Sequence, residues 1–461
     1  MIPLSLREIA AVVGGTVDGD PAVVVDGAAF VDSRDPVPGG LFVAVAGEHV
    51  DGHEYAAGAV GAGAAAVLGS RPTGVPAVLV EDPVAALGLL ARHLLDTLDV
   101  TVLALTGSQG KTGTKDYLAS VLGAAAPTVA TVSNFNNELG VPLTVLRADA
   151  TTAYLVVEMG ARGLGHIGYL CRIAPPRVGA VINVGTAHLG EFGSREAIAV
   201  AKGELVEALP ADGTAVLNAD DPLTAAMTAR TAARPLTFGE AGDVAWRGVE
   251  LDDLGRPSFE LGHAGAWHPV RLAQSGRHQV ANAAAAAAMA LAAGLPLADV
   301  AESLGAARSA SRWRMELTER ADGLLVVNDA YNANPASMAA AIDALVAIGS
   351  RRRRRTVAVL GEMKELGDEA LEAHREVGRL AAAAGVDLVV AVGEPARGIA
   401  EGARATERWT GRAVLTAGRD QAVAWVRENV AAEDVVLVKA SRGAALEKIA
   451  DGLLEGEGHT P

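Results

Sequence analysis

A glycine-rich segment near residue 110 carries the clearest chemical signal of the chain. Its residues are Thr106, Gly107, Ser108, Gln109, Gly110, Lys111 and Thr112. The segment lies between the apolar run 100–105 and a stretch with helical periodicity, so its backbone N–H groups and a helix N-terminus can bind an anion. We predict a phosphate-binding loop, with Lys111 on the β and γ phosphates and the Thr112 hydroxyl on magnesium. The loop is a short variant, because Leu105 stands where the general pattern has its first glycine.

Two more polar side chains follow apolar runs that we expect to be strands of the same sheet. Glu158 follows the run 154–157, and His188 follows the run 178–184. A carboxylate at that sheet edge can hold a cation, although an ordinary polar strand end would look the same. A histidine there is more often structural, and imidazole is an uncommon magnesium ligand.

Two polar positions farther along the chain allow alternative interpretations. Lys202 lies in a predicted helix, 194–209, and its local sequence alone indicates a surface lysine. The tract 275–282 ends a strand and opens a helix, and its polar groups could contact a nucleotide or merely cap that helix.

The last third of the chain contains two further polar clusters, each directly after a buried strand. Residues 328–335 include Asn and Pro residues that turn chemistry explains, but a turn does not require Asp329 or Tyr331. Residues 439–443 place cations after another strand. Ligands of open α/β sheets bind at the carboxyl ends of the strands.

The elements that position these residues indicate an α/β chain with three domains. Residues 1–97 have short apolar runs between Gly and Pro residues and end in a helix that Asp82 can cap and Pro83 can begin. Residues 98–314 alternate strands with helices, as a mostly parallel sheet requires, apart from short strand-like pieces over 235–275. A second alternation over 315–461 predicts a Rossmann-like domain, with strands at 324–327, 357–360, 388–392 and 435–438.

The composition excludes several classes of partner. The formal net charge of −16 argues against nucleic acid or an anionic membrane as the main partner. A single cysteine, Cys171, excludes an internal disulfide, and the sequence lacks a run of about 18 apolar residues. We therefore expect a cytoplasmic protein. The basic pentad 351–355 is predicted to be a solvated turn before a strand.

Taken together, these motifs resemble the Mur ligase family over nearly the whole chain. Within it they are most similar to the ligases that add D-alanyl-D-alanine to a UDP-N-acetylmuramoyl tripeptide. The segments that carry the resemblance are 32–34, 40–44, 51–53, 134–142, 157–160, 332–335, 361–363 and 439–442. The resemblance implies a small UDP-binding first domain, a central ATP-binding domain and a third domain that closes over the nucleotide.

The resemblance also implies roles for residues that match the family's motifs. Lys111 and Thr112 match the ATP loop, and Glu158 and His188 match magnesium ligands. Lys202 matches a lysine that the family carries as a carbamate, which holds a second magnesium ion. The remaining matches are Asn282 on the adenine side, Arg314 and Asp329 in the third domain, Ser33 and Arg34 at the UDP site, and Asn136 and Asn137 at the peptide site. Arg312 is an alternative to Arg314 for the nucleotide contact.

The implied reaction uses ATP to phosphorylate the terminal carboxylate of the UDP-linked tripeptide, and the amine of D-alanyl-D-alanine then attacks the acyl phosphate. This is a cytoplasmic step of peptidoglycan precursor synthesis, and we expect a monomer. A folylpolyglutamate-type ligase would share the ATP loop, but residues 1–97 and 332–335 argue against it. A nucleotide-switch ATPase would be expected to end its second motif strand in Asp rather than Glu158.

Overall fold

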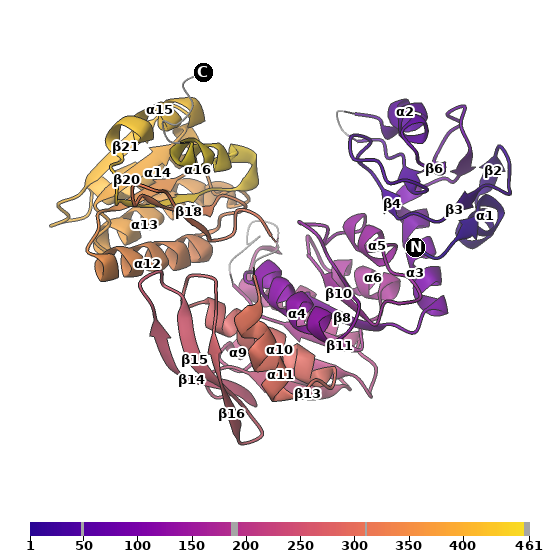
Figure 1. Cartoon of the computed structure of the whole chain (residues 1–461), viewed down its shortest axis with the longest axis horizontal. Helices are drawn as coiled ribbons and strands as arrows, with labels where there is room; N and C mark the ends of the chain where they lie inside the picture. Colours follow the sequence, from indigo (N-terminus) through magenta and orange to yellow (C-terminus); the bar gives the residue numbers. More distant parts are fainter. Residues whose placement is uncertain (48–49, 186–191, 309–310, 456–461) are drawn as a thin grey trace.

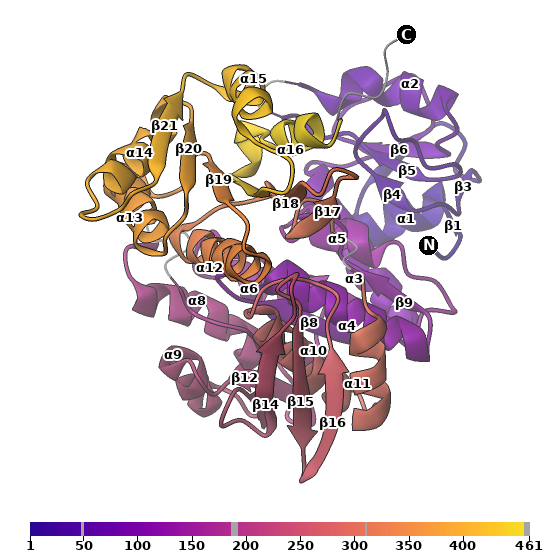
Figure 2. The same cartoon turned by 60° about the vertical axis from the view of Figure 1, so that its left-hand side comes forward.

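The computed structural model describes residues 1–47, 50–185, 192–308 and 311–455. Among the described residues, three large β-sheets follow one another along the chain, and helices cover each of them (Figure 1). In that view the second domain lies between the first, which holds the N-terminus, and the third, which holds the C-terminus. A turn of 60° places the first and third domains above the second (Figure 2). The predicted three-domain α/β architecture is confirmed.

The first domain is built on a five-stranded sheet of order β2-β7-β6-β5-β4, in which only β2 runs antiparallel to its neighbour. A separate pair, β1 and β3, is antiparallel. The elements are β1 (Leu4–Ser5), α1 (Leu6–Val13), β2 (Thr16–Asp18), β3 (Val24–Val25), β4 (Ala29–Phe30), β5 (Leu41–Val43), η1 (Gly52–Tyr55), α2 (Ala56–Gly61), β6 (Ala66–Gly69), β7 (Ala77–Leu79) and α3 (Pro83–Thr97).

Helix α3 joins the first domain to the second. As predicted, Asp82 caps it, since its Oδ1 accepts hydrogen bonds from the N–H groups of Val84 and Ala85 at 2.8 and 3.1 Å, and Pro83 is its first residue. The helix packs against α1 on one side and against α5 and α6 of the second domain on the other. One continuous apolar core therefore spans both domains.

The second domain contains a nine-stranded sheet of order β16-β15-β14-β13-β12-β11-β8-β10-β9. Its strands from β8 to β12 are parallel, as predicted, and β13 and β14 continue the parallel pairing. The elements are β8 (Thr101–Thr106), α4 (Lys111–Ala125), β9 (Thr128–Ala130), α5 (Gly140–Val145), β10 (Tyr154–Glu158), α6 (His166–Ile173), β11 (Val178–Val181), α8 (Arg195–Glu207), β12 (Thr214–Asn218), α9 (Pro222–Ala225), η2 (Ala226–Arg230), β13 (Arg234–Phe238), β14 (Val244–Leu251), β15 (Pro257–His263), β16 (Ala266–Arg271), α10 (Gln279–Ala292) and α11 (Leu297–Ala306).

Strand β8 is buried on both faces because successive side chains point to opposite sides of the sheet. Val102 and Ala104 join the core shared with the first domain, whereas Leu103 and Leu105 pack with helices α4 and α10. The strand-like pieces predicted over 235–275 are β13 to β16, and the last three form an antiparallel extension of this same sheet. The predicted strand 178–184 ends earlier, at Val181.

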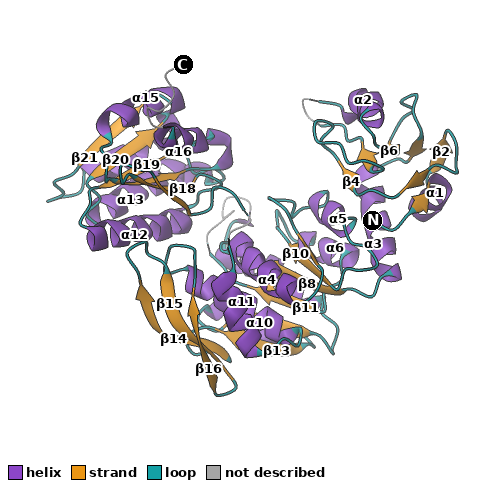
Figure 3. Ribbon diagram, viewed as in Figure 1, coloured by secondary structure: helices purple, strands orange, loops and turns teal. Residues whose placement is uncertain are grey.

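The third domain contains a six-stranded sheet of order β17-β18-β22-β19-β20-β21, with helices on both faces (Figure 3). Only the edge strand β17 is antiparallel, so the predicted second alternation is confirmed. The elements are β17 (Glu316–Glu319), β18 (Leu325–Asp329), α12 (Pro335–Arg352), β19 (Thr356–Leu360), η3 (Gly367–Glu369), α13 (Ala370–Ala383), β20 (Leu388–Val392), η4 (Glu394–Ala396), α14 (Arg397–Arg404), β21 (Arg412–Thr416), α15 (Arg419–Asn429), β22 (Val435–Lys439), η5 (Arg442–Ala444) and α16 (Glu447–Leu454).

The basic pentad 351–355 is only in part the solvated turn that its composition suggested, because three of its arginines are exposed but the segment also belongs to helix α12 and makes specific contacts. Its first two arginines end helix α12, and Arg353 caps that helix in the left-handed conformation with φ 55°. Arg354 donates to the Gly323 carbonyl at 2.7 Å, and Arg355 pairs with the buried carboxylate of Asp434. The segment between α12 and β19 is therefore held against the loops before β18 and β22 by these contacts.

Among the described residues, no helix combines the length and apolar character needed to cross a membrane.

Candidate functional site

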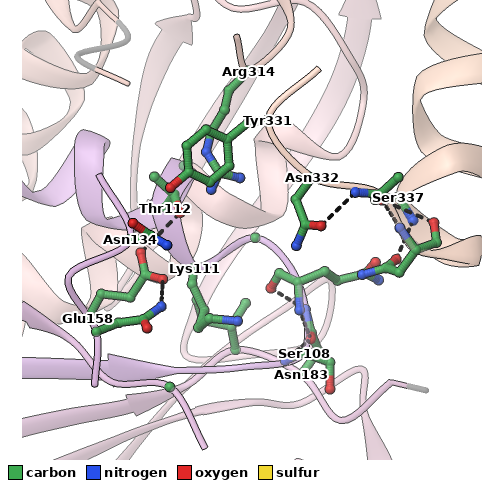
Figure 4. Close-up of a pocket in the computed structure, with 18 of the residues that line it drawn as sticks. Ser108, Lys111, Thr112, Asn134, Glu158, Asn183, Arg314, Tyr331, Asn332 and Ser337 are labelled. Carbon is green, nitrogen blue, oxygen red and sulfur yellow. Dashed lines mark hydrogen bonds between the residues drawn. The ribbon is translucent and has the colours of Figure 1, made fainter. Parts of the chain in front are cut away.

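A cavity of about 580 Å³ lies where the carboxyl ends of the second and third sheets face each other. Figure 4 shows side chains from both domains pointing into it. Its charged lining residues are Lys111, Glu158, Arg162, Lys202, Arg314, Asp329, Lys364, Glu365, Lys439 and Arg442. An acidic chain has thus gathered cations at one internal surface, as polyphosphate binding requires.

The predicted phosphate loop joins β8 to α4, in the strand–loop–helix order expected. Gly110 precedes the first residue of α4 with a left-handed φ of 78°. A Cβ atom at Gly110 would lie 2.4 Å from Oδ1 of Asn282, and one at Gly107 would lie 3.1 Å from Cβ of Ile182. Backbone conformation and close packing therefore both require glycine at 110. Thr106 ends β8, and neither it nor Gly107 lines the cavity, whereas positions 108–112 do.

Asn183, which the sequence did not single out as a site residue, fixes the shape of this loop. Its Oδ1 accepts the N–H groups of Ser108 and Gln109 at 3.0 Å each, and its Nδ2 donates to the Gln109 carbonyl at 3.0 Å. The position could have been noticed, because Asn183 follows β11, the strand beside β8. The loop is therefore held in place by a side chain of the neighbouring strand.

Lys111 is the first residue of α4, and its side chain folds back over the loop. Its Nζ donates to the Gly107 carbonyl at 2.7 Å, and burial lowers the pKa of its ammonium. Glu158 nearby raises that pKa and Arg314 lowers it. A buried ammonium that faces a cavity can be stabilised by an anionic ligand, since ligand charge offsets the cost of desolvation.

Glu158 lies beside the loop and is almost fully buried. Its Oε2 accepts the Thr112 hydroxyl at 3.0 Å, and its Oε1 accepts Nδ2 of Asn136 at 2.9 Å; Figure 4 shows Thr112 and Glu158 together. A carboxylate beside the loop's threonine suits Mg²⁺, which commonly takes one or two carboxylates and fills its other positions with water and phosphate oxygens. The described residues contain no group of three His, Cys, Asp or Glu side chains placed to hold a metal. His188 lies outside the described residues.

Lys202 is not the surface lysine that its local sequence indicated. Helix α8, which Ser194 caps through the N–H of Ala197, carries Lys202 on its inner face, where only 5% of the residue is exposed. Burial, together with the charge of Lys111, lowers the pKa of Lys202 to about 7. No acceptor within the described parts of the chain hydrogen-bonds to its Nζ, and it lines the cavity. The sequence could not show this burial because it depends on how α8 packs.

The opposite wall of the cavity belongs to the third domain. Lys439, at the end of β22, donates from Nζ to Oδ2 of Asp329 at 2.6 Å and to the Asn332 carbonyl at 2.8 Å. Asp329, at the end of β18, also accepts the N–H of Met315 at 3.1 Å. Arg442 pairs with Glu447 at 2.7 Å. Lys439 and Arg442 thus have protein carboxylates as partners.

One contact connects the two domains directly, and a second lies close to their junction. The Arg314 guanidinium lies 4.1 Å from the ring centroid of Tyr331, and the Tyr331 hydroxyl is 3.2 Å from Oγ of Ser133 in the second domain (Figure 4 labels Arg314 and Tyr331). Near the start of the third domain, Ser311 donates its N–H and its hydroxyl to the buried Asp116 of α4, at 3.2 and 3.1 Å. The helix that follows the phosphate loop therefore also contacts the segment leading into the third domain.

The structure distinguishes between the two candidate arginines. It also distinguishes between the two interpretations of the tract 275–282, ligand contact and helix capping. Arg314 lines the cavity, whereas Arg312 lines only a second cavity next to it. Helix α10 starts at Gln279, and no side chain caps its N-terminus. His278, Gln279 and Asn282 line the cavity instead, and burial lowers the pKa of His278.

The proposed substrate residues fall into two groups. Asn136 and Asn137 line the cavity, and Oδ1 of Asn137 also accepts the N–H of Gly140 at the start of α5. Ser33 and Arg34 lie in the first domain and do not line it. The Arg34 side chain is 88% exposed and pairs with Asp32 at 2.6 Å.

Comparisons with known proteins agree with this architecture. Three family models match successive parts of the chain: "Mur ligase family, catalytic domain" over residues 30–93, "Mur ligase middle domain" over 105–290 and "Mur ligase, glutamate ligase domain" over 313–442. The chain is 46% identical to the UDP-N-acetylmuramoyl-tripeptide–D-alanyl-D-alanine ligase of Mycobacterium tuberculosis, over 98% of both chains. It is 34% identical to the Escherichia coli ligase of the same name, over 99% of both.

Solved structures give the same result. MurF from Acinetobacter baumannii superposes with a TM-score of 0.86 at 34% identity, covering 98% of this chain and 99% of that one. MurF ligase from Thermotoga maritima in complex with ADP superposes with a TM-score of 0.79 at 30% identity, over 93% and 97% of the two chains.

Proposed function

The chain belongs to the Mur ligase family, and we propose that it joins D-alanyl-D-alanine to a UDP-N-acetylmuramoyl tripeptide with ATP as the energy source. The observation that carries this proposal is the cavity itself, in which a phosphate loop faces a second cationic wall. The full-length likeness to ligases of that name supports the choice of substrates.

The reaction needs two steps because a free carboxylate is a poor electrophile. A carboxylate oxygen of the tripeptide attacks the γ-phosphorus of ATP, the bond to the β-phosphate oxygen breaks, and ADP leaves. The amine of D-alanyl-D-alanine then attacks the acyl carbon, an amide forms, and the carbon–oxygen bond to phosphate breaks. The amine releases a proton in this step.

The main contribution of the protein is electrostatic and positional. We assign Lys111 and the N–H groups of positions 108–112 to the ATP phosphates. Arg314, at the start of the third domain's wall, Asp329 of the third domain and Asn282 of the second are assigned to the nucleotide. Asn136 and Asn137 would position the peptide, and Ser33 and Arg34 would bind the UDP group. Because the acyl phosphate must be kept from water, closing of the third domain over the cavity is part of the proposal.

Magnesium fits the second-domain wall. Thr112, Glu158 and His188 would hold an ion there, and the bound ion would offset phosphate charge. A second ion would need another anionic ligand. Lys202 could supply it as a carbamate, since its buried amine lacks a carboxylate partner among the described residues and lies near Lys111. The carbamate would add a carboxylate to a wall that is otherwise rich in lysine.

Three further expectations belong to this proposal. The domain boundaries are set at residues 97 and 314, the protein acts as a monomer, and the reaction takes place in the cytoplasm. A folylpolyglutamate-type ligase, which would use the same acyl-phosphate chemistry, is the alternative that the test must exclude.

The test is ADP release in the presence of ATP, magnesium and the UDP-muramoyl tripeptide, measured with and without D-alanyl-D-alanine. We expect steady ADP release only when the dipeptide is present, with one amide product per ADP. Release that ignores the dipeptide, or that responds instead to glutamate and a folate, would contradict the proposal.

A further inference from the structure

Lys364 stands apart from the other cations of the third-domain wall. It lies after β19, it is exposed, and it lines the cavity. Lys439 pairs with Asp329, Arg442 pairs with Glu447, and Arg314 stacks on Tyr331. In the described part of the chain, Lys364 alone among these four cations has neither a carboxylate nor an aromatic partner for its charged group.

The backbone around Lys364 holds it at the edge of the sheet. Its N–H donates to Oγ of Ser441 at 3.0 Å, which ties the segment after β19 to the segment after β22. A Cβ atom at Gly443 would lie 2.5 Å from Nζ of Lys364, so the ammonium rests in the space that the missing side chain leaves. The charge is thus anchored at the third-domain wall while its outer side faces the cavity.

The use of lysine here is itself informative. The chain has only six lysines among its 39 basic residues, and four of the six line this one cavity. Arginine meets most needs for positive charge elsewhere in the molecule. Lysine differs in presenting a compact point charge that can accept a single anionic group from several directions.

We propose that Lys364 binds the free carboxylate of the acceptor dipeptide and thereby aligns its amine for attack. This inference rests on the proposed function. D-alanyl-D-alanine is a zwitterion, and its two ends are separated by about 7 Å when extended. If the phosphate loop, Glu158 and the peptide site occupy the second-domain wall, the acceptor enters from the opposite wall. A carboxylate there requires a cation that is not already neutralised.

The experiment compares two acceptors, D-alanyl-D-alanine and D-alanyl-D-alaninamide, which lacks the terminal carboxylate. The wild-type protein should use the amide with a kcat/KM about tenfold lower or worse, since a charge-assisted hydrogen bond is lost. Lys364→Met should raise the KM for the dipeptide by a similar factor and treat both acceptors alike, while the KM values for ATP and the UDP substrate stay within about twofold. Lys364→Arg should keep part of the discrimination.

Lys448 supplies the matched control, because it is exposed on α16 and does not line the cavity. Lys448→Met should discriminate between the two acceptors as the wild type does. An unchanged dipeptide KM in Lys364→Met would overturn the inference while dipeptide-dependent ADP release by the wild type left the proposed function intact. A rise in the KM for the UDP substrate alone would also overturn it, because Lys364 would then bind a carboxylate of the tripeptide.

Discussion

The two walls of the cavity are built alike and charged differently. Each is the carboxyl edge of a parallel sheet, one ending in the phosphate loop after β8 and the other in the segments after β18 and β22. On the second-domain wall, Lys202 is buried and Lys111 is partly buried, and desolvation lowers the pKa of both. On the third-domain wall, Lys439 already has Asp329 as a partner.

This difference predicts that the cations of one wall serve mainly ligand binding and that those of the other serve mainly the stability of the fold. Buried cations without full compensation make the folded protein less stable than it could be, and an anionic ligand removes that cost. Cations with carboxylate partners contribute to the fold itself, because removing one partner leaves a buried charge. Substitutions on the second-domain wall should therefore abolish turnover, whereas those at the Lys439 pair should unfold the third domain first.

The largest effect is expected at Lys111. Lys111→Met should lower kcat by about a thousandfold, because a preorganised charge near the transferred phosphoryl group is lost. Its free energy of unfolding in urea should stay the same or rise, since a desolvated ammonium is removed. A large loss of stability in this variant would show that Lys111 belongs to the fold and would remove the contrast between the walls.

Lys202 tests the same wall by a different chemistry. Lys202→Ala should abolish measurable turnover while keeping the circular dichroism spectrum and the unfolding midpoint of the wild type. In ¹³C-bicarbonate, the wild type should show a carbamate carbon resonance that Lys202→Ala lacks, and Lys448→Ala should retain it. Near-normal turnover in Lys202→Ala would remove the carbamate from the mechanism.

Lys439 is the counterpart on the third-domain wall. Lys439→Met should reduce the free energy of unfolding by about 3 kcal/mol, since the partly buried carboxylate of Asp329 is left without its cation. Adding Asp329→Asn should restore part of that loss in urea denaturation. If Lys439→Met unfolds like the wild type and only loses activity, Lys439 serves binding rather than stability, and the contrast between the two walls is lost.

Asn183 should give an intermediate effect. Asn183→Ala leaves the N–H groups of Ser108 and Gln109 without their acceptor and loosens the loop. We expect the KM for ATP to rise by about tenfold, in line with the loss of two partly buried hydrogen bonds, and the KM for the dipeptide to stay constant. Equal changes in both KM values would indicate general damage to the second domain.

The smallest effect is expected where the walls touch. Tyr331→Phe removes the hydroxyl that meets Ser133 but keeps the ring under Arg314. One neutral hydrogen bond is worth about 1 kcal/mol, so kcat should fall by no more than about fivefold. Ser133→Ala should cause the same change, and the double variant should be no worse than either single one.

Local sequence signals predicted the elements well. The cap at Asp82, the order β8–loop–α4 and the second alternation after residue 315 depend on residues adjacent in the chain, and the structure confirms them. The short pieces over 235–275 were recognised as strands. Their antiparallel pairing onto the second sheet was not, because pairing depends on contacts distant in sequence.

In the site, too, the features that depend on adjacent residues were predicted, and those that depend on distant contacts were not. Glu158 and Lys111 were identified from their places at strand and helix ends, and the cavity brings them together. The burial of Lys202 depends on how its helix packs, and the hydrogen bonds from Asn183 to the loop depend on which strand adjoins β8. The local sequence could reveal neither. The resemblance to a family identified Lys202 where local chemistry did not.

The acyl-phosphate route is tested most directly by following the carboxylate oxygens of the tripeptide into the products. The UDP-muramoyl tripeptide is prepared with both oxygens of its terminal carboxylate as ¹⁸O, and the phosphate released with D-alanyl-D-alanine is examined by mass spectrometry. Attack of the carboxylate on ATP at this cavity predicts one ¹⁸O atom in each phosphate and the other in the new amide. Unlabelled phosphate accompanying labelled product would contradict the acyl-phosphate route.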